Sequence, residues 1–206
     1  MEREEILEAL LRRVREAKSL EDIAEVFKDA FGLDDGCLKF AKNLAAILNG
    51  ELPVYTRELA QYLESLDTKT AIDQVGQYFS AAFPAWRQTP HGNLPLLVLE
   101  RMTGAEIGAK TQIVLLSPDT LRKQAEHHPE LTQEDYEKAQ DVIKRGQRFK
   151  QNERKLAFMI DEPNGRAVII KVTKNGDELY ATSIWRLSSK DERRIKAMRK
   201  LMKEKS

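Results

Sequence analysis

The chain has few of the residues that metal sites and disulfide frameworks need. Its 206 residues include three histidines and one cysteine, Cys37, so a disulfide within the chain is excluded. HExxH, a CxxC pair and a DxDxDG loop are missing, as are a glycine-rich phosphate loop, a dinucleotide fingerprint and a GxSxG elbow. We therefore expect no metal and no cofactor, and any catalysis should rest on acid–base and electrostatic effects.

Long hydrophobic runs are also missing. No apolar stretch approaches the length that crosses a bilayer, and the first residues are acidic and amphipathic, unlike a signal peptide. With a single cysteine, these features predict a cytoplasmic protein that has no membrane partner.

The charge is divided unevenly along the chain. The formal net charge is +1, but residues 1–100 hold 11 Lys/Arg against 17 Asp/Glu, and residues 101–206 hold 23 against 16. From Lys144 onward the count is 18 against 8. This split predicts a polyanion-binding unit joined to a part of opposite sign. The alternatives are that the charges only solvate helix surfaces, or that the acidic part covers the basic part and masks it.

Apolar periodicity predicts three regions and an α+β fold. Residues 1–83 show helical stripes only and predict a small helical bundle, while the proline-rich residues 84–95 (PAWRQTPHGNLP) predict a linker. Residues 96–206 predict a domain with a small antiparallel β-sheet packed on helices. Its expected elements are a strand at 112–116, a helix from Ser117-Pro118, a helix capped by Thr132 and Asp135, a strand at 155–160, a hairpin at 166–187 and a final helix capped by Ser189 and Glu192.

The hairpin is the clearest element. Asn175-Gly176 is typical of a type I′ turn, and strand-forming residues lie on both sides of it. If Lys174 and Asp177 close the turn, the numbers of opposed residues add up to 351. One face is then apolar: on it Val172 opposes Leu179, Ile170 opposes Ala181 and Val168 opposes Ser183, and Trp185 continues the same face. The other face is polar: on it Thr173 opposes Glu178, Lys171 opposes Tyr180 and Ile169 opposes Thr182, and Arg186 lies farther along the same face.

The polar face suggests a site for metal-free cleavage of RNA by its own 2′-hydroxyl. That reaction needs a group that takes a proton, a group that gives one, and cations over the phosphate. Lys171 and Arg186 would supply the cations, Tyr180 and Thr182 hydrogen bonds, and His128 a titratable imidazole.

Each of these residues also has a structural interpretation. Lys171 and Tyr180 form an ordinary exposed cross-strand pair, Arg186 pairs with a carboxylate or covers Trp185, and His128 belongs to a rigid loop. Ser183 is either a structural serine facing a helix or a sign that this end of the sheet opens.

The residues from about Thr111 to Leu187 resemble a known family. The order of SPDT, HHPELTQEDY, KLAFMID and ATSIWRL resembles the phage-encoded branch of the barnase/EndoU/colicin tRNase/RelE-like (BECR) nuclease superfamily, often found as C-terminal domains of phage head-morphogenesis proteins. The resemblance implies helices followed by a four-stranded antiparallel sheet, and metal-independent endoribonuclease activity on tRNA or other structured RNA.

The resemblance also implies site residues and partners. It carries over His128, Thr182, Ser183 and Arg186 as catalytic residues, while Lys171 and Tyr180 rest on the hairpin register. Arg166, Arg193, Arg194 and Lys196 are expected to bind nucleic acid. The protein would act as a toxin or a virion-associated effector, with an immunity, docking or phage head partner bound through the acidic bundle. The alternative is a non-catalytic module that binds nucleic acid or protein during phage head assembly.

Overall fold

A computed structural model of the chain describes residues 57–90, 92–162 and 165–187, together with Tyr55 and a few isolated positions. The helices expected before residue 55, and the cap and helix expected after Leu187, lie outside this part of the chain apart from those isolated positions. No helix among the described residues is long and apolar enough to cross a membrane.

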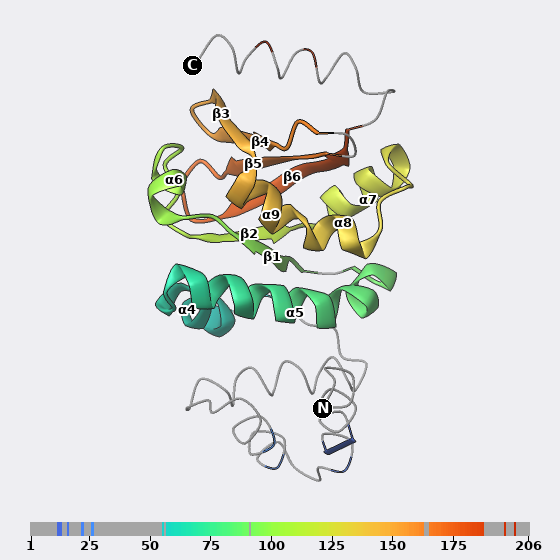
Figure 1. Ribbon diagram of the computed structural model, residues 1–206. Helices are drawn as coiled ribbons and strands as arrows, with labels where there is room; N and C mark the ends of the chain where they lie inside the picture. Colours follow the sequence, from blue (N-terminus) through green and yellow to red (C-terminus); the bar gives the residue numbers. More distant parts are fainter. Residues whose placement is uncertain are drawn as a thin grey trace.

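The described residues form one six-stranded mixed sheet with helices packed around it (Figure 1). The strand order is β1-β2-β6-β5-β4-β3, and every neighbouring pair is antiparallel except β2 and β6, which are parallel. The helices are α4 (Arg57–Ser65), α5 (Thr68–Gln88), α6 (Arg101–Ala105), α7 (Pro118–His127), α8 (Gln133–Glu137) and α9 (Ala139–Arg145). The strands are β1 (Leu94–Val98), β2 (Ile113–Leu116), β3 (Gln147–Asn152), β4 (Lys155–Met159), β5 (Arg166–Val172) and β6 (Leu179–Arg186).

This arrangement confirms the α+β class and corrects the sheet. The expected sheet was small and antiparallel, whereas the observed one has six strands and one parallel pair. Sequence patterns missed β3 and the short helix α6, and they merged α8 and α9 into one helix. The predicted helix starts are correct, since Ser117 Oγ accepts the Thr120 N–H and Asp135 Oδ2 accepts the Thr132 N–H.

The linker expected at residues 84–95 is wrong at both ends, because α5 continues through Pro84 to Gln88 and β1 begins at Leu94. A proline inside a helix leaves the carbonyl four residues earlier without its usual donor. Here the side-chain amide of Gln133 donates to the Ser80 carbonyl at 3.2 Å. Phe83 and Trp86 are buried in the same core cluster as the sheet. Burial and a substitute hydrogen bond therefore outweigh the local preference of proline.

The hairpin register is correct near the turn and wrong beyond it. Val172 opposes Leu179, Ile170 opposes Ala181 and Lys171 opposes Tyr180, as predicted. The turn differs from the predicted one, because the Gly176 N–H donates to the Thr173 carbonyl, which makes Lys174 and Asn175 its central residues in place of Asn175 and Gly176. The register then shifts, so that Ile169 opposes Ser183 and Val168 opposes Ile184. Thr182 is the extra residue of a β-bulge in β6. From Ser183 onward, the shift moves every β6 side chain to the face opposite the predicted one.

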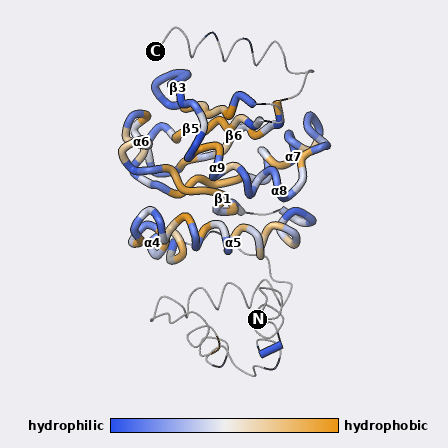
Figure 2. The backbone as a smooth tube through the Cα atoms, viewed as in Figure 1, coloured by the Kyte–Doolittle hydropathy of each residue, from blue (hydrophilic) through white to orange (hydrophobic). Residues whose placement is uncertain are grey.

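The two faces of the β5–β6 ribbon bury different sets of residues. We call the side that meets α8 and α9 the helix face; Val168 and Ile184 belong there, in the main core. The reverse face contains Trp185, which packs with Phe149, Met159 and Ala167 in a second cluster. Trp185 was expected among the residues of the main core, so that assignment is wrong. Figure 2 shows the hydrophobic residues concentrated along the strands and the hydrophilic ones along turns and outer helix surfaces.

Candidate nucleic-acid interface

A fully buried carboxylate, Asp135, organises the end of the sheet. The capping position at the start of α8 turns its side chain toward the ends of β5 and β6, where Arg166 and Arg186 oppose each other. Arg186 holds both carboxylate oxygens, through Nε at 2.7 Å and Nη2 at 2.6 Å. Arg166 donates to Oδ1 through Nε at 3.1 Å and Nη2 at 2.9 Å, and the Thr132 N–H and hydroxyl reach Oδ2.

These donors keep Asp135 ionised in a buried position. Burial alone raises the pKa of the Asp135 carboxyl, but hydrogen bonds from Arg186, Thr132 and Arg166 outweigh burial and hold the pKa well below its ordinary value. The pKa of Arg186 is raised by its hydrogen bonds to Asp135 and by the nearby charges of Asp135, Glu134 and Glu130. Asp135 is thus a fixed acceptor that orients two guanidinium groups.

Both arginines keep donors that Asp135 does not use. A guanidinium has five N–H donors, and each of these side chains presents its Nε and Nη2 edge to the carboxylate. The Nη1 groups have no partner among the described residues. The Arg186 side chain is 39% exposed and that of Arg166 is 18% exposed, so both remain within reach of solvent. Paired guanidinium groups held in this way suit the oxygens of a phosphate.

His128 lies beside the same end of the sheet. It caps α7, its side chain is 12% exposed, and its Nδ1 lies 3.2 Å from Glu130 Oε1. Glu130 is close enough to Arg186 to contribute to the raised pKa of that arginine. The contact with Glu130 occupies Nδ1 of the imidazole and leaves Nε2 as the ring nitrogen without an assigned partner.

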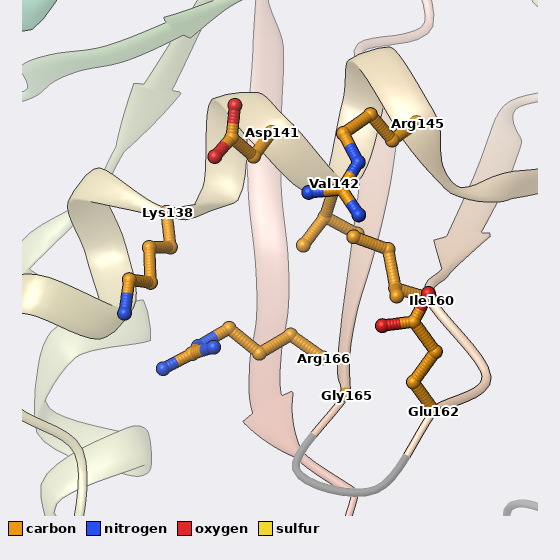
Figure 3. A pocket seen from close by; sticks show the side chains of 8 residues that line it. All are labelled: Lys138, Asp141, Val142, Arg145, Ile160, Glu162, Gly165 and Arg166. Atoms are coloured by element: carbon orange, nitrogen blue, oxygen red, sulfur yellow. The ribbon is translucent and has the colours of Figure 1, made fainter.

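A hollow of about 230 Å³ is lined in part by Arg166 (Figure 3). It lies between α9 and the turn that joins β4 to β5, and three of its lining residues are cationic: Lys138, Arg145 and Arg166. Lys138 also pairs with Glu134.

The predicted catalytic residues do not gather on one surface. Lys171 and Tyr180 lie on the reverse face, whereas Arg186 points to the helix face and binds Asp135, as the carboxylate-pairing interpretation held. The Tyr180 hydroxyl accepts a hydrogen bond from Asn93 at 3.0 Å, and burial followed by the charge of Glu178 raises the tyrosine pKa. Lys171 is exposed. The polar hairpin face, with Lys171 and Arg186 side by side, is therefore not formed.

The remaining predicted residues fall in several places. Ser183 opposes Ile169 on the reverse face, not on the apolar face of the main core, and Thr182 is the exposed bulge residue, whose hydroxyl lies 3.4 Å from the Ile169 carbonyl. Arg166, expected to bind nucleic acid, is the partner of Arg186. Arg193 and Arg194 lie outside the described residues, and Lys196 is an exposed residue in helical conformation.

Sequence reasoning missed the central role of Asp135. The capping pattern identified it as part of a helix start, and the HHPELTQEDY segment that resembles the nuclease family includes Glu130 and Asp135 without giving either of them a role. Lys138 and Arg145 carried no signal beyond their charge. Within the part of the chain that the structure describes, no group of three or more His, Cys, Asp or Glu side chains is placed to hold a metal.

Comparisons with known proteins identified no similar protein. A scan of protein-family models, a search of curated proteins and a search of solved structures each found no match.

Proposed function

We propose that the protein is a metal-independent endoribonuclease whose phosphate-binding site is the Arg166–Arg186 pair. The observation that carries the proposal is the pair itself: two guanidinium groups on adjacent strands, oriented by one buried carboxylate, each with an Nη1 that Asp135 does not use. His128 pairs with Glu130, whose charge acts on Arg186. The sequence resemblance to phage nucleases supports the same activity. The proposal includes a biological role as a toxin or as a virion-associated effector.

The chemistry follows from the positions of three groups. Nε2 of His128 takes the proton of an RNA 2′-hydroxyl, and the resulting 2′-oxygen attacks the adjacent phosphorus. Arg166 and Arg186 hold the two non-bridging oxygens as negative charge develops on them. His128 then returns the proton to the departing 5′-oxygen. The products are a strand with a 2′,3′-cyclic phosphate and a strand with a free 5′-hydroxyl.

The test is incubation of the purified full chain with total RNA in the presence of EDTA. We expect cleavage of RNA and none of DNA, which lacks the 2′-hydroxyl. His128→Ala should slow cleavage by about 100-fold or more, the usual effect of a lost acid–base group. Lys174→Ala removes an exposed cation at the hairpin turn and should cleave as the natural chain does.

Two further variants locate the site. Arg186→Lys retains the positive charge but loses the two-point contact with Asp135, and we expect it to lower the cleavage rate while the chain stays folded. Lys171→Ala decides between the two faces of the ribbon. Loss of cleavage in Lys171→Ala, with full activity in Arg186→Lys and His128→Ala, would overturn the arginine site in favour of the reverse face.

A second candidate is a non-catalytic module that binds nucleic acid, or a phage head protein, through the same basic end of the sheet. The specific observation in its favour is that Lys171 and Arg186 lie on opposite faces. RNA binding that weakens steeply with salt, with intact RNA throughout, would support this candidate and exclude the nuclease.

A further inference from the structure

The hollow beside Arg166 combines three cations with a small apolar floor. Val142 lines it from α9, and Ile160 lines it from the position that follows β4. In Figure 3 the Arg145 guanidinium turns toward the middle of the hollow, and the Lys138 ammonium lies on the same side as the Arg166 guanidinium. Its volume of about 230 Å³ is below the roughly 300–1,000 Å³ of drug-sized sites, so it suits a small ligand unit.

Arg145 has donors to offer in this hollow, and Arg166 connects the hollow with the arginine pair. Arg145 is exposed and makes no ion pair with any other residue that the structure describes. Arg166 presents Nε and Nη2 to Asp135, so its Nη1 remains for a ligand. Because Arg166 lines the hollow and also belongs to the arginine pair, one extended anionic ligand can reach both places.

Two carboxylates, Asp141 and Glu162, also line the hollow. They would repel a bare phosphate ion, but they accept hydrogen bonds from hydroxyl groups. A ribonucleotide supplies both kinds of group, since its phosphate meets the cations and its ribose hydroxyls donate to a carboxylate. In Figure 3 the Glu162 carboxylate points inward, whereas that of Asp141 lies at the rim.

Gly165 keeps this side of the hollow in its observed shape. A Cβ atom at this position would lie 1.9 Å from the Ile160 carbonyl oxygen and 2.8 Å from that of Glu162. The close approach of the backbone at the turn therefore requires glycine, and the Gly165 N–H donates to the Glu162 carbonyl at 2.8 Å.

We propose that this hollow binds the nucleotide adjacent to the scissile phosphate, with Arg145 on its phosphate and Glu162 on its 2′-hydroxyl. The inference rests on the proposed function in taking RNA as the ligand, and it adds a second phosphate contact and a preference for RNA over DNA. The 2′-hydroxyl is the group by which a protein distinguishes the two nucleic acids.

Binding of a labelled single-stranded RNA of about eight nucleotides tests the subsite. The full chain carrying His128→Ala is used so that the RNA stays intact, and a gel verifies that it does. Arg145→Ala should raise Kd by about tenfold, the effect of one lost charge-assisted contact. The slope of log Kd against log salt should fall by about 0.7, the value for one phosphate contact on a single strand.

Lys174→Ala is the matched control, because it removes one exposed positive charge that follows the opposite end of β5 from Arg166 and has no assigned role. It should leave Kd within about twofold of the parent value. The salt slope should stay within about 0.2 of the parent value, which is less than the change for one phosphate contact. Glu162→Ala should bring the Kd values for RNA and for DNA of the same sequence within about twofold of each other, since it removes the contact that reads the 2′-hydroxyl.

The outcomes separate the subsite from the nuclease activity. Equal Kd and salt slope for Arg145→Ala and Lys174→Ala, or equal binding of RNA and DNA by the parent chain, would overturn the subsite even if the natural chain cleaves RNA. Conversely, the His128→Ala chain could show the expected changes in Kd while the natural chain, which retains His128, never cleaves RNA. That result would establish the hollow as a nucleotide-binding subsite and reject the nuclease.

Discussion

Asp135 offers the sharpest test of how the two arginines are held. Asp135→Asn retains the size of the side chain and removes its charge, which leaves two guanidinium groups facing a neutral amide. Breaking a buried ion pair by removing one partner costs about 3–5 kcal/mol. Arg186 is 39% exposed and can regain water, so we expect a loss near the lower limit, about 3 kcal/mol in the free energy of unfolding.

That loss is large compared with the total stability of a domain, about 5–15 kcal/mol. For a chain of this size, each kcal/mol corresponds to roughly 2–4 °C, so the Tm should fall by roughly 6–12 °C. Urea unfolding measures the change directly. Trp86 and Trp185 are both buried, and their fluorescence reports the loss of both core clusters.

The pH dependence gives an independent check with a definite sign. Because the folded-state pKa of Asp135 is lowered, its contribution to stability is fully present above its unfolded pKa of about 3.9 and is lost as the pH falls through the folded value. The stability difference between the natural chain and Asp135→Asn should therefore be constant at neutral pH and shrink below about pH 4.

Two further variants separate charge from packing. Asp141→Asn removes an exposed carboxylate that pairs with no other described residue, and it should change stability by no more than about 0.5 kcal/mol. Replacing Asp135, Arg166 and Arg186 together by Leu, Met and Met should restore most of the stability, because no buried charge is then left unpaired. A loss below about 1 kcal/mol in Asp135→Asn would refute the claim that this carboxylate compensates the arginine charges.

Two other predictions concern the backbone near the site. Gln133→Ala should destabilise the chain by about 1 kcal/mol, because the Ser80 carbonyl loses its donor. In a Pro84→Ala background, Gln133→Ala should have less than half that effect, since alanine restores the backbone N–H that reaches the Ser80 carbonyl. An equal effect in both backgrounds would contradict the explanation of how the helix tolerates Pro84. Gly165→Ala should lower the free energy of unfolding by about 2–3 kcal/mol through its clash with the backbone. Gly76→Ala, where a Cβ meets nothing within 4 Å in α5, should raise it by about 0.5–1 kcal/mol, and circular dichroism melts compare the two.

Local signals in the sequence predicted local features well. The strand pairs nearest to Asn175-Gly176 were predicted correctly although the turn itself was not, and the caps at Ser117 and Thr132 marked the starts of α7 and α8. The failure at Pro84 has a tertiary cause, because its compensation comes from Gln133, which follows many residues later. Such a contact leaves no trace in the pattern around a proline.

The site was less accessible to sequence reasoning than the fold. Asp135 is 31 residues from Arg166 and 51 from Arg186, so no spacing rule relates them. The capping pattern showed why a short polar side chain stands at position 135, and the charge count showed an excess of cations after Lys144. Neither observation indicates that one carboxylate orients two of those cations.

The β-bulge at Thr182 explains why the arginines meet Asp135. In an uninterrupted ladder Arg186 would share a face with Lys171, and a lone Arg166 would face α8. One extra residue changes the parity of the strand, so that Ile184 enters the main core and Arg186 comes to lie beside Arg166. Bulges often re-aim a side chain next to a functional site, and Thr182 has a side chain that is at home in a regular strand, so its sequence does not reveal the insertion. The position of the cationic pair is therefore decided by a backbone irregularity in β6, and the buried carboxylate of Asp135 is the acceptor that makes this position stable.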